Sequence, residues 1–457
     1  RGDGARARVL LEQATRLDAS NPLIWIALAS ASEHAGNLAG SLAAAERAQA
    51  LAPKEPLFHY AIARLAKASG DTARARREME AAVHQYSTIA SWHRQLADLC
   101  AEEGDLEAAR ASYDAALEHL KEEKGVKRTQ EEALTRFCRG RVLVRLERLT
   151  DAIVEMENAI DLLPGKHEWH SELAEHLMET GRWVEAQSWL RSAISQAPEQ
   201  ADYPLRLAEA QAANEELDAA CETLRSSCGR WPEYAPAWLL LGQLLLQQGE
   251  LEAAYEVLTQ AATLAPEDAS TQVALGDALW RQGEIEQARE RFEQALELDV
   301  QNAEAHVFLG RLLAREGEAD AAMEAYHAAL RLDPQHLHAH YFLGRLCQRI
   351  GHLNKAAVHL RHVVDSSPNS HWAWAALAEC SEASGEIDLA YEYYERANEV
   401  AQGKAYYFLP MGRLLKELRR YQEAIPVLRQ AVKVDPNHTE AYKLLAAVSA
   451  IAFFSGR

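Results

Sequence analysis

The sequence lacks long apolar runs and paired cysteines, and both absences exclude classes of protein. No apolar run reaches the roughly eighteen residues of a membrane-spanning helix, and the run Leu444–Phe454 has only eleven. The six cysteines form no C-x-x-C pair, which argues against a zinc or redox centre. Cys100 and Cys347 fall on an apolar helical stripe, so we expect them in the core. Scattered single thiols favour a reducing compartment, and we expect a cytoplasmic protein.

Motifs of the common catalytic and nucleotide-binding families are also missing. The chain has no phosphate-binding glycine loop, no H-E-x-x-H and no G-x-S-x-G, so we expect no catalytic residue and no cofactor. His336, His338 and His340 alternate, and on a helix this spacing turns successive rings about 200° apart, away from a shared metal. His359 and His362 are i, i+3 neighbours, but the sequence assigns them no third ligand. We therefore expect no metal site.

Basic residues are outnumbered by acidic ones. The chain carries 48 Lys and Arg against 68 Asp and Glu, a formal net charge of −20. This excess argues against a general affinity for nucleic acid or anionic membranes, which requires a basic face. We expect a protein or peptide partner, no nucleic acid and no insertion into a membrane.

What the sequence does contain is a pattern of 34 residues that recurs twelve times. The eighth position is Ala or Gly in every unit, and the twentieth is Ala in every unit after the first. Small residues at fixed positions predict close contact between helices. A unit this short cannot bury its own apolar face, so neighbouring units must stack. The units begin at Pro22, Pro56, Ala90, Ala133, His167, Ala201, Ala235, Ala269, Ala303, Leu337, His371 and Ala405.

The unit that begins at Ala235 shows the anchors of the pattern most clearly. In order they are Trp238, Leu241, Gly242, Leu245, Gly249, Ala254, Leu258, Ala261 and Pro266. The first four predict one amphipathic helix, the second glycine a turn, the next three a second helix and the proline its end. This spacing resembles the tetratricopeptide repeat. The resemblance implies an all-α fold, an α-solenoid of tandem helix-turn-helix repeats in a right-handed superhelix with a concave inner groove.

The period also predicts how the chain is organised. We expect a partial repeat and three full repeats in residues 1–123, a charged insertion in 124–132, nine repeats in 133–438 and a truncated or capping helix in 439–457. The insertion marks either a segment boundary or a longer helix pair with a solvated loop at Gly125, and we favour the second. Both ends fall inside a repeat, so we expect more polypeptide or a partner there, and end-to-end self-association stays open.

Pro410 interrupts the first helix of the last full unit. It removes a backbone donor, so we expect this helix to begin near Leu409 and to leave Gln402–Phe408 as a loop with Tyr406 and Tyr407 exposed. A hinge at this loop is the alternative to a merely shortened helix, and we favour the shortened helix.

Positions 2, 5, 9, 12 and 13 of each unit form a second helical stripe, which in the tetratricopeptide family faces the concave groove. Its middle part, with one residue at the margin, is acidic and comprises Asp98, Glu168, Glu172, Glu175, Glu179 and Glu209. Further along it becomes basic and aromatic, with Trp280, Arg311, Arg315, Tyr341, Arg345, Arg349, Trp372 and Arg413. Phe308 and Phe342, at the sixth position of successive units, lie at its margin.

This division by charge suggests two binding surfaces. Guanidinium groups form paired hydrogen bonds with carboxylates, and neighbouring aromatic rings anchor side chains. We therefore expect the basic part to bind an acidic peptide segment or a C-terminal carboxylate, with Tyr341 and the tryptophans as apolar anchors. The acidic part would prefer a basic segment. A solvated, charge-mixed groove that binds nothing is the competing interpretation.

The chain departs from two kinds of relative. Members of the family that clamp a chaperone's C-terminal carboxylate carry Asn at position 9, and no unit has Asn there; the groove asparagines of the nucleocytoplasmic sugar transferases are also missing. The resemblance implies a non-catalytic scaffold or adaptor that holds a partner protein in the groove and supports complex assembly. Two alternatives stay open, a recruiting or regulatory arm of a larger multidomain enzyme and an envelope scaffold for secretion or polysaccharide export.

Overall fold

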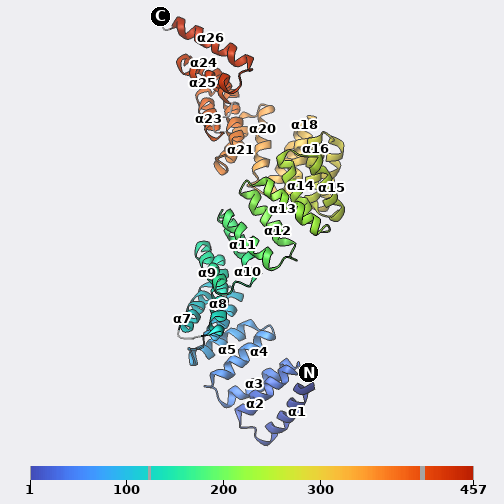
Figure 1. Ribbon diagram of the computed structural model, residues 1–457, viewed down its shortest axis with the longest axis vertical. Coiled ribbons are helices and arrows are strands. Elements are labelled where there is room, and N and C mark those ends of the chain that lie inside the picture. The colour runs from blue at the N-terminus through green and yellow to red at the C-terminus, as the bar shows by residue number, and fades with distance from the viewer. Residues whose placement is uncertain (1, 122–124, 402–406, 456–457) are drawn as a thin grey trace. The chain divides into compact units, whose positions relative to one another are not determined.

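The computed structural model describes residues 2–121, 125–401 and 407–455. Across these ranges the chain forms 26 helices and no strand (Figure 1). It divides into two compact units, Arg1–Ser227 and Cys228–Arg457. Within each unit, successive helices pack as antiparallel pairs joined by short turns. The expected all-α solenoid of helix-turn-helix repeats is confirmed.

The helices follow the predicted period closely. Those of the first unit are α1 (Gly2–Leu17), α2 (Pro22–His34), α3 (Leu38–Leu51), α4 (Pro56–Ala68), α5 (Thr72–Gln85), α6 (Ala90–Glu102), α7 (Leu106–Leu120), α8 (Val126–Arg145), α9 (Leu149–Leu162), α10 (His167–Glu179), α11 (Trp183–Gln196) and α12 (Asp202–Ala213). The next helix, α13 (Leu217–Arg230), contains the boundary between the units.

The second unit continues the same alternation. Its helices are α14 (Ala235–Gln248), α15 (Leu251–Leu264), α16 (Ala269–Gln282), α17 (Ile285–Leu298), α18 (Ala303–Glu316), α19 (Ala319–Leu332), α20 (Leu337–Arg349), α21 (Leu353–Ser366), α22 (His371–Ala383), α23 (Ile387–Val400), α24 (Phe408–Glu417), α25 (Tyr421–Val434) and α26 (Thr439–Ser455). Among all these helices, none has both the length and the apolar character needed to cross a membrane.

The fourth position carries Trp, His or Gln in nine of the twelve repeats, because its side chain holds the loop between successive repeats. In nine repeats a side-chain nitrogen at this position donates to the backbone carbonyl six residues earlier, as Trp238 does to Pro232 at 3.0 Å and His340 to Pro334 at 3.1 Å. That carbonyl belongs to the loop that enters the helix. Each bond fixes the loop and contributes about 1 kcal/mol.

The eighth position is small because a side chain of the second helix occupies the adjacent space. A Cβ added to Gly310 would lie 2.7 Å from Cε1 of Tyr326, and one on Gly276 would lie 2.5 Å from Cε1 of Phe292. Such distances are too short for any real contact. Large side chains of the second helix therefore pack directly on the backbone of the first, and this packing explains the pattern of small residues.

The charged insertion lengthens a helix. Residues 126–132 form the first turns of α8, a helix of 20 residues preceded by Gly125 with φ 107°. Two acidic residues of this extension are ion-paired, Glu131 with Arg94 at 2.6 Å and Glu132 with Arg136 at 2.9 Å. The first pair joins the extension to α6 of the preceding repeat, and the second lies within α8.

The helix that contains Pro410 begins at Phe408, one residue before the expected Leu409. The expectation that Tyr407 is exposed was wrong, because only 9% of its surface is accessible. Its hydroxyl is 2.7 Å from Nδ1 of His371, and its ring packs near Tyr394. The remainder of that expected loop, including Tyr406, lies outside the described residues.

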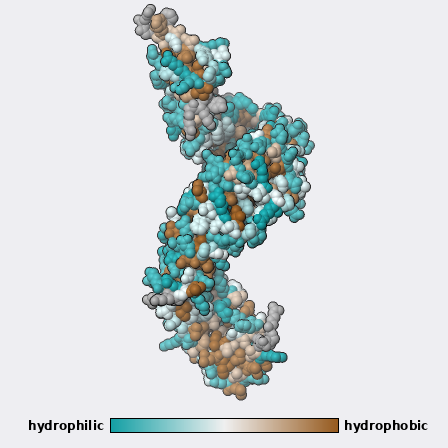
Figure 2. Space-filling model, viewed as in Figure 1, coloured by the Kyte–Doolittle hydropathy of each residue, from teal (hydrophilic) through white to brown (hydrophobic). Residues whose placement is uncertain are grey.

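Cys100 and Cys347 are buried in the core, as expected. Some apolar side chains are exposed at the N-terminal end of the first unit, where Figure 2 shows hydrophobic surface over α1 to α3. Leu10, Leu17 and Leu23 contribute to it. At the other end, Val448 of α26 packs against Leu428 of α25.

Candidate functional site

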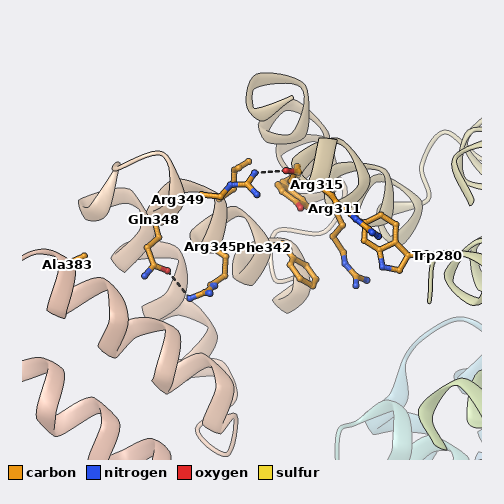
Figure 3. A pocket seen from close by; sticks show the side chains of 11 residues that line it. Trp280, Arg311, Arg315, Phe342, Arg345, Gln348, Arg349 and Ala383 are labelled. Atoms are coloured by element: carbon orange, nitrogen blue, oxygen red, sulfur yellow. Dashed lines mark hydrogen bonds between the residues drawn. The ribbon is translucent and has the colours of Figure 1, made fainter. Parts of the chain in front are cut away.

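A cavity of about 780 Å³ opens over successive first helices of the second unit, α16, α18 and α20 (Figure 3). These helices contact one another in order, α16 with α18 and α18 with α20. Five of the eight residues expected in the basic groove line the cavity, Trp280, Arg311, Arg315, Arg345 and Arg349. The cavity therefore gathers most of the basic stripe at one place.

Arg311, which lines this cavity, lies among aromatic rings. Its guanidinium carbon is 4.6 Å from the ring centroid of Phe342, 4.9 Å from that of Phe308 and 5.5 Å from that of Trp280. All three distances are within the range of cation–π attraction. Burial lowers the pKa of Arg311. Within the described chain its guanidinium has no ion pair and no hydrogen bond, so its charge is available to an anion.

The other arginines of the cavity differ in the partners that their guanidinium groups already have. The guanidinium of Arg315 is 5.4 Å from the ring centroid of Trp280 and, among the described residues, has no carboxylate partner. Arg349 donates at 2.6 Å to the carbonyl of Ala314 in the last turn of α18, a bond that fixes its side chain without neutralising it. Arg345 is neutralised, because it pairs with Glu379 and also donates to Gln348.

Three predicted residues do not line the cavity. Tyr341 and Trp372 pack edge to face beside it, with ring centroids 4.5 Å apart. Burial raises the pKa of Tyr341. Arg413 is exposed on α24, 4.0 Å from a carboxylate oxygen of Glu382. Of the expected apolar anchors, the cavity includes Trp280 but not Tyr341 or Trp372.

Sequence reasoning underestimated two residues. Phe342, expected only at the margin, forms part of the wall, and Tyr326 of the second helix α19 also reaches the cavity. The sequence contained a signal for Phe342, because phenylalanine occupies the sixth position in two successive units. A long arginine side chain at position 9 extends to the sixth position of the next unit, and its reach does not follow from helical spacing within one unit.

Five of the six expected acidic residues, all except Asp98, line two smaller cavities of about 470 and 380 Å³ in the first unit. Five of the six expected carboxylates have a partner there or nearby: Asp98 with Arg94, Glu168 with His167, Glu172 with Arg141, Glu175 with Arg206 and Glu179 with His176. Glu209 forms no ion pair or hydrogen bond within the described ranges, and burial of its carboxylate raises its pKa. Arginine side chains thus neutralise three of the six expected carboxylates, Asp98, Glu172 and Glu175.

The histidines do not form a metal site in the part of the chain that is described. Nδ1 of His340 is 3.0 Å from Nδ1 of His359, and the ring centroids of His340 and His362 are 4.1 Å apart. Nowhere in the described ranges do three His, Cys, Asp or Glu side chains group so as to hold a metal ion.

Comparison with known families gives a consistent result along most of the chain. Four family models, each described as "Tetratricopeptide repeat", match it. The first matches residues 1–56, 60–122 and 273–336, the second 233–299, the third 143–204 and 313–363, and the fourth 408–448. The search of curated proteins found no match.

Solved structures include similar folds at low sequence identity. The APC/C hetero-tetramer Cut9-Hcn1 is 15% identical, with a TM-score of 0.51 over 98% of this chain and 94% of that chain. YrrB, described as a TPR protein with an unusual peptide-binding site, is 24% identical, with a TM-score of 0.35 over 41% and 97%. Naa15/Naa10 bound to HypK-THB is 15% identical, with a TM-score of 0.37 over 99% and 89%. The first of these shows a shared fold.

Proposed function

The chain belongs to the tetratricopeptide repeat family, and we propose that it is a non-catalytic scaffold that binds an acidic segment of a partner protein in the groove of its second unit. The observation that carries the proposal is Arg311, a half-buried guanidinium between three aromatic rings that forms no ion pair or hydrogen bond with a carboxylate in the described chain. Arg315 and Arg349 add two further positive charges to the same cavity.

The surroundings of Arg311 favour an anionic ligand on energetic grounds. Removing a charge from water is unfavourable unless another group compensates it. Aromatic rings compensate by about 0.5–2 kcal/mol, and they leave the N–H donors of the guanidinium free. A carboxylate accepts two parallel hydrogen bonds from those donors. Such charge-assisted pairs are among the strong hydrogen bonds that arginine forms. The cavity is therefore better completed by a carboxylate than by water.

The shape of the site favours a peptide segment. Its cations and rings come from three successive repeats, and stacked repeats present such extended surfaces to extended ligands. Helices in contact lie about 8–10 Å apart, so side chains on α16, α18 and α20 are spaced to contact several residues of an extended chain. Phe342 and Trp280 supply apolar contacts on either side of Arg311.

The proposal is tested by fluorescence anisotropy with the whole chain and pairs of labelled peptides that differ only in Asp against Asn. The substitutions Arg311→Gln and Arg315→Gln should each weaken binding of the acidic peptide at least tenfold, a change of about 1.4 kcal/mol or more. Arg413→Gln is the matched control, since Arg413 occupies the same repeat position outside the cavity. Equal losses in all three variants, or no preference for Asp over Asn, would refute the proposal.

The two alternative roles depend on the same groove. A recruiting arm of a larger enzyme or an envelope scaffold would also hold its partner by the free cations of the second unit. Identification of the protein that the wild-type chain retains and the Arg311→Gln chain loses would then distinguish these roles.

A further inference from the structure

A second cavity of about 430 Å³ adjoins Arg311 in the second unit. Helices α14, α16 and α18 form it, so it lies one repeat before the basic cavity on the same row of first helices. Its polar wall consists mainly of acceptors and amides, Gln243, Gln247, Ser270, Asp277 and Glu304. Arg281, the one cation among the lining residues, is already engaged on both sides, with Asp277 at 2.8 Å and with the carbonyl of Leu246 at 2.8 Å.

Asp277 has one carboxylate oxygen without a partner. The residue is 6% exposed, and its Oδ2 accepts from Arg281. Its Oδ1 is buried and accepts no hydrogen bond from any group in the described chain. A buried carboxylate oxygen without a donor is rare in native proteins and calls for an explanation. A ligand that brings a donor into the cavity supplies one.

Phe308 links the second cavity to Arg311. This ring lines the second cavity, and the guanidinium of Arg311 in the first cavity is 4.9 Å from its centroid. Asp277 and Arg311 occupy the ninth position of adjacent repeats. Their helices contact each other, so the two side chains begin about 8–10 Å apart, which an extended peptide covers in about three residues.

We propose that the groove recognises a pair of opposite charges in the partner segment. A lysine or arginine of the segment donates to the carboxylate of Asp277 in the second cavity, while an acidic residue about three positions away binds Arg311 in the first. A cationic donor is favoured over a neutral one because Asp277 and Glu304 outnumber the single cation Arg281 in that wall. This inference rests on the proposed function and specifies the partner's chemistry.

Arg311 itself is the competing donor for Asp277. The two groups attract each other electrostatically, and a rotation of the arginine would bring them closer. In that case, Asp277→Asn would change how strongly the acidic residue of the peptide binds and would leave the contribution of its basic residue unchanged. The experiment therefore has to measure the two peptide charges separately.

A double-mutant cycle separates them. Eight labelled peptides, four in each order along the chain, carry Lys or norleucine at one position and Asp or Asn three residues away. They are titrated against wild-type, Asp277→Asn and Arg311→Gln chains by anisotropy. We expect Lys to strengthen binding to the wild type about tenfold and to have little effect with Asp277→Asn, while the Asp preference persists in that variant and disappears in Arg311→Gln.

Two results would overturn the inference and leave the proposed function intact: an unchanged Lys preference in Asp277→Asn, or a loss of the Asp preference in that variant. If the wild-type chain shows no preference for Asp over Asn, both this inference and the proposed function are refuted. If Asp277→Asn does not fold, as judged by thermal unfolding, Gln247→Lys replaces it. Gln247 is an exposed residue of the same wall, and a cation there should abolish the Lys preference by competing for Asp277.

Discussion

Arg141 of the first unit and Arg311 of the second occupy the same position of their repeats and have different chemistry. Both guanidinium groups lie over an aromatic ring, Arg141 at 5.1 Å from Phe137 and Arg311 at 4.6 Å from Phe342. Arg141 also donates twice to Glu172, at 2.6 Å each, and this hydrogen bonding raises its pKa. Burial lowers the pKa of Arg311, which has no such partner among the described residues.

One position in the next repeat accounts for the difference. Its sixth residue is Glu172 after Arg141 and Phe342 after Arg311. A carboxylate at this position neutralises the arginine and links two successive first helices, whereas a phenylalanine packs on the guanidinium and leaves its charge free. Arg141 of the first unit therefore contributes to the stacking of repeats, whereas Arg311 of the second unit has no carboxylate in ion-pair contact within the described chain.

The strongest test gives the second unit the chemistry of the first. Phe342→Glu should pair with Arg311 and weaken binding of an acidic peptide about 100-fold, or about 3 kcal/mol, because the ligand must displace an ion pair and approach a like charge. Anisotropy titration measures the loss. Phe342→Leu is the control, and it should cost much less because only one ring contact is removed. Unchanged binding in Phe342→Glu would contradict our account of the sixth position.

The glycine beneath the basic cavity offers a second test. Gly310→Ala should destabilise the second unit by about 2 kcal/mol, because the new Cβ would lie 2.7 Å from the Tyr326 ring. The first unit has alanine at the same position, Ala97, packed with Tyr113. Urea unfolding measures the change. The reverse substitution Ala97→Gly should cost only about 1 kcal/mol through helix propensity, and equal stability of wild type and Gly310→Ala would show that the close packing is not required.

Histidines at matched positions predict a difference in pH response. In the first unit, Nδ1 of His59 is 2.7 Å from a carboxylate oxygen of Glu78. The equivalent positions of the second unit carry His340 and His359, whose Nδ1 atoms are 3.0 Å apart. His340 donates through Nε2 to a carbonyl, so in the neutral pair its Nδ1 accepts from His359. Protonation of both rings would place two donors against each other.

The sign of the pH effect follows from the pKa of His359. Burial, with His340, His327, His362 and Lys355 nearby, lowers this pKa from 6.5 to about 4. Between these values the unfolded chain binds a proton that the folded chain does not. Stability is therefore complete above pH 6.5 and falls as the pH decreases toward 4. We expect a loss of about 1–2 kcal/mol, discounted for partial exposure.

Hydrogen exchange at neutral and mildly acidic pH measures this loss repeat by repeat. Protection should decrease in α20 and α21 and persist in α4 and α5, where His59 lies. His359→Gln is the control. An amide does not titrate, so the pH dependence should decrease to the part that the partly buried His340 contributes. A similar decrease in both pairs of helices would contradict the comparison.

The sequence predicted the fold well because each anchor has a local physical cause. Small residues at the eighth position, such as Gly310, indicate close packing even before the partner Tyr326 is known. The period then fixes the helices, and α24 shows that proline shifts a helix start as expected, to Phe408. Burial of Tyr407 was not predictable, because its contact with His371 joins residues 36 positions apart.

The candidate site was predictable only in part. Helical spacing identified the stripe, and it brought Trp280, Arg311 and Arg315 to one cavity. It could not distinguish free cations from engaged ones. Arg345 is neutralised by Glu379 and Arg349 is held by a backbone carbonyl. Both partners belong to a neighbouring repeat, so they depend on how repeats stack and on which rotamer reaches across.

Substitutions at the turn between paired helices have the smallest expected effect on stability. The residue at this turn differs between repeats. Most repeats have glycine there with positive φ, as at Gly249 with 83°, but Glu215 occupies the same position with φ 64°. The left-handed conformation costs a residue with a side chain about 1 kcal/mol. Glu215→Gly should therefore stabilise the first unit by about 0.5–1 kcal/mol in urea unfolding, and Gly249→Ala should destabilise the second by a similar amount. A loss of stability in Glu215→Gly would mean that the contacts of its side chain outweigh the backbone strain.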